Sequence, residues 1–218
     1  MEQPTHPNAR VSQDEHRALE AQIRESYGRV AYSHKAHEKS ADIYHGRLQN
    51  LKLAQIILSA ITTGGIIITL FGESRISTVI AAITSTVLLT INTYTKEHDL
   101  GELAQKHASV AGDLWNAREA YLSLLTDLAS RSAPAEEIRK RRDKLQETLK
   151  NIYKAAPRTI PKAYSAAQAA LKINEELTFS EEEIDNMLPP YLRRGSTQEP
   201  ESAQQRPPAD AVNRAAEL

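Results

Sequence analysis

Three histidines have the spacing that first suggests chemistry. His34 and His37 are three residues apart, so their imidazoles lie near one face of a helix, and His107 stands far downstream. With a further ligand, this spacing suits a metal ion. All three also lie on or beside hydrophobic seams, and we therefore prefer packing and hydrogen bonding at an interface. The sequence has no phosphate-binding glycine loop, HExxH motif or GxSxG elbow. We expect a non-enzyme with no metal and no cofactor.

The charged residues indicate which classes of partner the chain could bind. The run Arg139, Lys140, Arg141 and Arg142 could contact acidic lipid or a nucleotide phosphate. A solvated face balanced by nearby glutamates is the simpler interpretation. The whole chain has a net charge of −1, which argues against a nucleic-acid-binding protein. It contains no cysteine, which excludes disulfides and thiolate metal sites.

Polar side chains recur at helical spacing within two uncharged, apolar segments. They are candidates for lining a water path in an oligomer: Gln55, Ser59, Thr62, Thr69, Thr86, Thr90 and Asn92. The alternative is that such residues let membrane helices approach closely and hydrogen-bond to each other. From the sequence alone we favour this alternative. Neither segment contains a charged residue, so machinery for a proton relay or a coupled pump is not evident.

The two segments have the length of membrane spans. Residues 53–72 and 76–95 are 20 residues each, and a helix of this length crosses a hydrocarbon core of about 30 Å. Lys52, Glu73, Arg75 and Lys96 stand at their edges. A charge at mid-bilayer costs roughly 2.5–3.5 kcal/mol, so two uncharged windows are informative. We predict a membrane hairpin, with a buried hairpin in a soluble bundle as the alternative.

Basic residues predict the orientation of the hairpin. The turn contains one cation, Arg75, whereas the flanking helices carry Lys35, Lys39, Arg47, Lys52, Lys96 and Lys106. The positive-inside rule then places both termini in the cytoplasm, in a protein of the inner membrane.

Outside the spans, apolar residues alternate in steps of three and four, as in a coiled coil. The principal stalk positions are Tyr27, Val30, Tyr44, Leu48, Leu100, Leu103, Val110, Leu114 and Tyr121. Two such seams beside a hairpin are expected to meet as an antiparallel stalk. The register that this implies places Leu48 opposite Leu100, and Ala41 opposite His107.

The complete prediction is an all-α membrane protein with four regions. Residues 1–11 are disordered, and 12–131 form a long helical hairpin that is roughly continuous from stalk to span. Residues 132–192 form small cytoplasmic helices, which Pro134, Pro161 and a Ser180–Glu183 capping box begin. Residues 193–218 form a disordered tail.

Three stretches of the chain resemble the SLATT family of two-span proteins from bacterial conflict systems. They are ESYGRVAYSHKAHEKSADIYHGRLQNLKLAQIILSAI, the hairpin followed by LAQKHASVAGDLWNAREAYLSLLTDL, and KNIYKAAPRTIPKAYSAAQAALKINEELTFSEEEIDNMLP. Order, spacing and topology agree over about residues 15–192. The resemblance implies a membrane effector that assembles and permeabilises the inner membrane when a linked sensor, often a nucleotide-signal synthase or nucleotide-binding module, is activated. This chain has no such module fused to it, so its trigger is expected in trans, or the cytoplasmic helices themselves receive it.

Two functional hypotheses therefore stand. The first is a homo-oligomeric pore-forming effector of antiviral defence, whose partners are the lipid bilayer and a nucleotide-signalling sensor. The second is a membrane-anchored scaffold or sensor for a cytosolic protein. Replacement of the hydroxyl stripe by leucine would abolish the activity of the first and leave the second unaffected.

Overall fold

The computed structural model describes residues 7–72 and 75–194, with side chains from residue 13 onward. Every element in these ranges is helical, which confirms the predicted all-α class. Helix α1 (Pro7–Phe71) has 65 residues and passes through the stalk and the first apolar segment without a break. At 1.5 Å per residue it is about 100 Å long. It begins at Pro7 and not at the predicted residue 12. The remaining parts of the predicted disordered ends, 1–6 and 195–218, lie outside the described residues.

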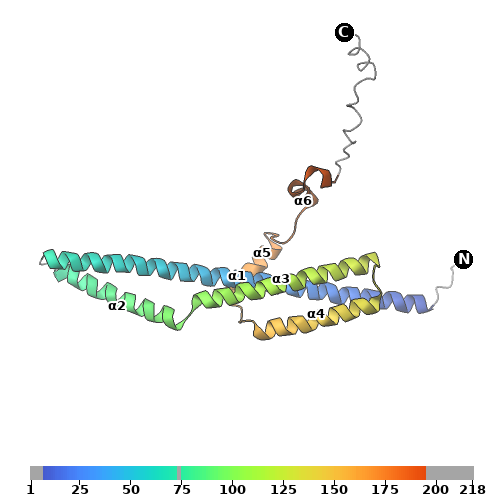
Figure 1. Ribbon diagram of the computed structural model, residues 1–218, viewed down its shortest axis with the longest axis horizontal. Coiled ribbons are helices and arrows are strands. Elements are labelled where there is room, and N and C mark those ends of the chain that lie inside the picture. The colour runs from blue at the N-terminus through green and yellow to red at the C-terminus, as the bar shows by residue number, and fades with distance from the viewer. Residues whose placement is uncertain (1–6, 73–74, 195–218) are drawn as a thin grey trace, which may run out of the picture. The chain divides into compact units, whose positions relative to one another are not determined.

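Helices α2 (Arg75–Glu97) and α3 (Leu100–Ser130) return along α1 (Figure 1). The sequence predicts one roughly continuous helix here, and this prediction fails at His98 and Asp99. Asp99 leaves the helical region with φ −73° and ψ 83°, and its carboxylate accepts a hydrogen bond from the Glu102 backbone N–H at 2.7 Å. This bond satisfies one of the free N–H groups at a helix start, so α3 begins with its own N-cap.

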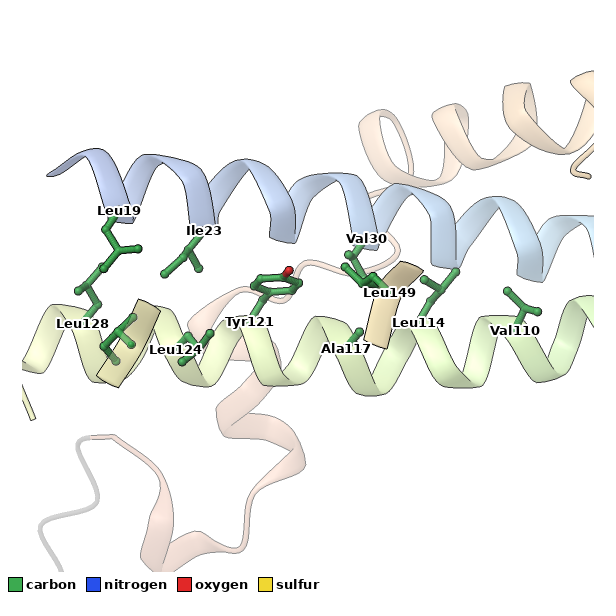
Figure 2. Packing of buried hydrophobic residues seen from close by; sticks show 11 residues of the cluster. Leu19, Ile23, Val30, Val110, Leu114, Ala117, Tyr121, Leu124, Leu128 and Leu149 are labelled. Carbon is green, nitrogen blue, oxygen red and sulfur yellow. The ribbon is translucent and has the colours of Figure 1, made fainter. Parts of the chain in front are cut away.

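The core lies between α1 and α3 (Figure 2). Its fully buried side chains include Ile23 of α1 and Leu114, Tyr121 and Leu124 of α3. Burial of each large apolar side chain contributes about 1.5–3 kcal/mol, so this interface dominates the stability of the stalk. The cluster is completed by Leu19, Val30, Val110, Ala117, Leu128, Ile138 and Leu149.

The register of the stalk follows from the position of His107. Its ring lies 5.0 Å from the His37 ring and is stacked 5.5 Å from the Tyr44 ring, centroid to centroid. It therefore sits in a hole on α1 between these two residues, which agrees with the predicted pairing of Ala41 with His107. Beside the spans, Leu48 lies against Gly101.

Two shorter helices cover the stalk. Helix α4 (Ala135–Ala155) follows Pro134 and packs mainly on α3, where Ile138 and Leu149 join the core. Helix α5 (Pro161–Lys172) packs on α1. Its buried residues are Ala163, Ala167 and Ala170, which lie on one face, and small side chains there allow the two helices to approach closely.

The described residues from Glu175 to Arg194 belong to a compact unit separate from that of the long helices. Its described part contains α6 (Glu181–Met187) and the 3₁₀ turn η1 (Pro190–Leu192). Ser180 and Glu183 form the predicted capping box. The structure therefore divides the predicted 132–192 region, since α4 and α5 belong with the long helices and α6 does not.

Candidate functional site: the apolar hairpin and its stalk

The hairpin formed by the end of α1 and by α2 presents an apolar surface along its length. Both helices are long and apolar enough to cross a membrane. Large side chains are widely exposed, among them Leu70 (74%), Phe71 (89%) and Ile76 (74%). A soluble bundle would bury these groups, and monomeric soluble proteins rarely expose contiguous apolar patches of this kind. The surface suits lipid, which solvates it without penalty.

Polar side chains pair across the inside of the hairpin. Gln55 Nε2 donates a hydrogen bond to Asn92 Oδ1 at 2.8 Å. The Thr62 and Thr84 hydroxyls lie 2.9 Å apart. Nearer the turn, the Thr69 hydroxyl is 3.3 Å from that of Ser77 and 3.2 Å from that of Thr78. Polar contacts at three depths thus tie α1 to α2, as expected where no water competes for hydrogen bonds.

The two helices come close together at Gly65. A Cβ atom there would lie 3.0 Å from Ala81 Cβ and 3.3 Å from the Ser77 carbonyl oxygen. A Cβ atom on the neighbouring Gly64 would meet nothing within 4 Å. Only one glycine of the pair therefore contributes to helix contact, and Ser77 and Ala81 supply the matching small residues on α2.

A second polar stripe lies on the opposite side of α2. Thr86, Thr90 and Thr93 each follow a residue of the α1-facing seam (Ser77, Ala81 and Thr84) by nine positions, or about two and a half helical turns. All three are exposed, and their hydroxyls donate to the carbonyls of Ala82, Thr86 and Leu89. Thr90 and Thr93 line a shallow depression of about 440 Å³ with Glu97 and His98. We call these three threonines the outer stripe.

Six of the seven candidate lining residues separate into two sets. Gln55, Thr62, Thr69 and Asn92 are bonded within the hairpin, whereas Thr86 and Thr90 belong to the outer stripe. Ser59 is exposed on α1. Sequence reasoning missed Ser77, Thr84 and Thr95 as partners of the first set. Their signal was the heptad alternation, which continues through 77, 81, 84, 88, 91 and 95.

The stalk residues of the predicted seam are all buried or half-buried. Val30, Leu100, Val110, Leu114 and Tyr121 are buried, and Tyr27, Tyr44, Leu48 and Leu103 are half-buried. Tyr27 also receives the guanidinium of the buried Arg118, which lies 5.5 Å above its ring and 4.6 Å above the ring of Trp115. Arg118 further pairs with Glu119 at 2.6 Å, so its charge is compensated inside the interface.

Three buried histidines form a hydrogen-bonded cluster in the stalk. His37 Nδ1 and His107 Nδ1 lie 3.0 Å apart, so one ring donates and the other accepts. His34 Nδ1 donates to the Ala111 carbonyl at 2.9 Å. Burial, then the neighbouring His107 and His34, lower the pKa of His37 to about 4, and burial lowers the pKa of His107. The hydrogen bond between His37 and His107 requires one unprotonated Nδ1 atom as the acceptor, which agrees with neutral rings. Within the described residues no group of three His, Asp or Glu side chains is placed to hold a metal ion.

Residues 19–183 match the sequence model of the SMODS and SLOG-associating 2TM effector domain family 4. That match covers the spans, the stalk and the helices that pack on it. The chain belongs to the SLATT family. Comparison with the curated proteins and with the solved structures finds no significant match. The two apolar helices are therefore the two transmembrane helices of a SLATT effector domain, and the protein is a membrane protein.

The basic run of the SLATT chain is engaged within the fold. Arg141 pairs with Asp127 at 2.6 Å, and Arg139 lies 3.5 Å from Glu15 of α1. Arg142 bonds to Gln22 and Asp143. These contacts hold α4 against the stalk of the SLATT hairpin, which agrees with the simpler interpretation of a balanced face.

Proposed function

We propose that this SLATT protein is a bacterial defence effector that oligomerises and permeabilises the inner membrane when a nucleotide-signalling partner activates it. The observation that carries the proposal is the outer stripe, since it lies on the side of α2 away from α1, the helix that packs on α2 in the spans, and its hydroxyls bond only to carbonyls of α2 among the described residues. Two helices enclose no water path, so several copies are required. The family name, which describes a two-span effector domain, supports the same role.

The two sets of polar residues in the hairpin have different roles in this proposal. Residues bonded between α1 and α2 hold each hairpin together as a rigid unit. The outer stripe then meets the equivalent surface of neighbouring copies, and on activation it borders water. Threonine suits both states, because its hydroxyl bonds to its own helix in lipid and to water in a lumen.

The proposed orientation has both termini in the cytoplasm. Arg75 is the single cation of the described turn region, whereas basic residues are frequent on the stalk near the spans. The positive-inside rule then directs the stalk toward the cytoplasm, where a soluble partner has access to it. In this proposal the chain itself catalyses no reaction. It permeabilises the membrane in response to a signal that another protein makes or senses.

The proposal is tested by inducing the protein with its genomic neighbours in bacteria and following membrane potential and dye exclusion. We expect depolarisation with the natural chain. The triple variant T86V/T90V/T93V keeps side-chain shape but removes three hydroxyls, and it is expected to abolish depolarisation. The control is Thr63→Val, another exposed threonine on α1 whose hydroxyl bonds to the Ser59 carbonyl.

The alternative function, a membrane-anchored scaffold for a cytosolic partner, makes the opposite prediction. A scaffold would capture its partner equally well with the triple variant and would leave the membrane potential unchanged in all cases. Retained potential with the natural chain, under conditions in which its partners are active, would therefore contradict the effector proposal.

A further inference from the structure

A cleft of about 910 Å³ opens on the stalk, away from the hairpin. Its walls come from α1, the end of α4, the connection to α5, and α5 itself. Residues 28–37 of α1 form one side, and Tyr153, Arg158 and Tyr164 form the other. This volume is within the range of small-molecule sites, about 300–1,000 Å³. Neither the proposed pore nor the hairpin uses it.

The lining of the cleft combines aromatic rings with positive charge. Tyr32 and Tyr164 face each other at 5.5 Å between ring centroids, and Tyr153 donates a hydrogen bond to Ser33 at 3.1 Å. Arg29 and Arg158 also line it, and the lining contains no Asp or Glu. Arg29 keeps a long, exposed pair with Glu25 at 3.7 Å. Arg158 forms no ion pair or hydrogen bond with any residue that the structure describes.

These features select one chemical class of ligand. Guanidinium groups bind phosphate or carboxylate oxygens, often in a bidentate manner. Tyrosine rings stack on planar rings of a ligand. A flat apolar molecule would leave Arg158 without a partner, and a simple anion would make no use of the tyrosine rings. The lining therefore fits a small anion that carries a planar ring.

The cleft also reaches the histidine cluster. His37 lines it and, on α3, contacts His107 at 3.0 Å. A ligand in the cleft would therefore touch a residue of the α1–α3 interface. The cleft further spans α1 and α5, which belong to one compact unit. A ligand bound in the cleft would therefore change how tightly α1 packs against α3 and α5.

The geometry points to a binding site for a nucleoside phosphate in this cleft, held by Arg158 and Arg29 and by the tyrosine rings. Its use as the trigger site of the effector rests on the proposed function, whereas binding itself does not. The site is separate from the membrane hairpin, so the two ideas are testable apart.

Binding is measured by calorimetry on the full chain in lipid nanodiscs, with the four ribonucleoside 5′-monophosphates as probes. The nucleosides serve as ring-only probes, and inorganic phosphate serves as the anion-only probe. We expect at least one monophosphate to bind tenfold or more tightly than its nucleoside or phosphate. Equal affinity for the nucleoside would overturn the role of the arginines, and absence of binding by all four would overturn the site.

Two variants with matched controls locate the binding. A Cβ at Gly28 meets nothing within 4 Å and Gly28 lines the cleft, so Gly28→Leu places a side chain in the cleft and is expected to abolish binding. Gly46 is equally unobstructed and does not line the cleft, so Gly46→Leu is the control. Arg158→Gln is expected to weaken binding about tenfold, with Arg24→Gln as its control. Full binding by Gly28→Leu would place the ligand elsewhere and overturn the proposal.

A flux measurement separates this inference from the proposed function. Leakage from vesicles containing the natural chain is compared with and without the nucleotide that binds. Binding with no leakage under any condition contradicts the pore and leaves the site standing. Leakage that ignores a bound nucleotide overturns its use as a trigger.

Discussion

Gly64 and Gly65 are adjacent in α1 but have opposite surroundings. Gly65 faces Ala81 so closely that an added Cβ would sit 3.0 Å from it, whereas Gly64 faces open space. We predict that Gly65→Val separates the two spans and that Gly64→Val does not, although both replace glycine in the same helix. Because the chain has no cysteine, the T62C/T84C pair reports this contact by disulfide formation in the membrane.

The cross-link is expected in the otherwise natural chain and in the Gly64→Val background, and to fall several-fold with Gly65→Val. Overpacking a close contact typically costs about 1–3 kcal/mol, which is enough for this shift. Equal cross-linking in both glycine variants would show that the helices do not meet at Gly65.

The histidine cluster predicts acid sensitivity of the stalk. Burial and the neighbouring rings hold the pKa of His37 near 4, below the value of about 6.5 in an unfolded chain. Above pH 6.5 both states are neutral and stability is constant. Between pH 6.5 and 4 the unfolded chain binds a proton that the folded stalk does not. The free energy of unfolding therefore falls by up to about 1.4 kcal/mol per pH unit for this ring.

Urea unfolding followed by helical circular dichroism across this pH range tests the prediction. His37→Gln is expected to flatten the slope, although His107, whose pKa is also lowered, keeps part of it. His45→Gln, at an exposed position, is the control and should retain the full slope. An unchanged slope with His37→Gln would remove this ring as the cause.

At the scale of single residues, the sequence identified the polar candidate lining residues but not their hydrogen-bond partners. Gln55, Thr62 and Asn92 were named as lining residues, and the structure bonds them inside one hairpin. Which face of a uniformly hydroxyl-rich helix meets its neighbour depends on the seam, and on small residues such as Gly65 and Ala81. The sequence assigned no binding role to Arg158, because the residues that form the cleft with it come from α1 and α5.

At the scale of elements, the interruption between α2 and α3 depends on Asp99. Its carboxylate caps α3 through the Glu102 N–H at 2.7 Å. We predict that Asp99→Ala lowers the free energy of unfolding of the stalk by about 1 kcal/mol, the usual cost of losing an N-cap. Asp113→Ala removes a carboxylate from an exposed position within the same helix and should change it far less.

Urea unfolding of the two variants measures the difference. Equal destabilisation by both would mean that loss of negative charge, and not loss of the cap, is responsible. The Asp99 signal was available in the sequence, since Asp followed three residues later by Glu is a helix-start pattern. The helix start at Asp99 was not predicted, because the heptad seams continue in line with the spans and favour one continuous helix.

Element boundaries elsewhere were largely predictable, because prolines and caps mark them. Pro134, Pro161 and the Ser180–Glu183 box begin α4, α5 and α6, as expected. The heptad alternation of α1 extends further than predicted, from the stalk through Leu51, Gln55, Thr62 and Gly65. That α5 packs on α1 and α4 on α3 was not predictable, since alanine-rich and sparsely apolar faces fit many neighbours.

At the scale of the whole molecule, one helix links the membrane to the stalk. α1 carries its half of the paired surface of the spans, two of the three clustered histidines and one wall of the cleft. A change at the cleft therefore has a continuous helical route to the hairpin. The sequence predicted the antiparallel hairpin and stalk because length, charge placement and heptads all indicated the same topology. The proposed assembly of several copies was not predictable in the same way, because it depends on surfaces that one chain leaves exposed.

The most direct test of the central claim is the water accessibility of the outer stripe. Single cysteines are introduced into the cysteine-free chain at Thr86, Thr90 and Thr93, at Thr62 inside the hairpin, and at the exposed apolar Ile80, which lies on a different face of α2 from the outer stripe. A membrane-impermeant thiol reagent is applied to activated cells, and labelling rates are compared. We predict rapid labelling at 86, 90 and 93, and slow labelling at 62 and 80. Labelling of the outer stripe as slow as that of position 80 would contradict a water path lined by these threonines.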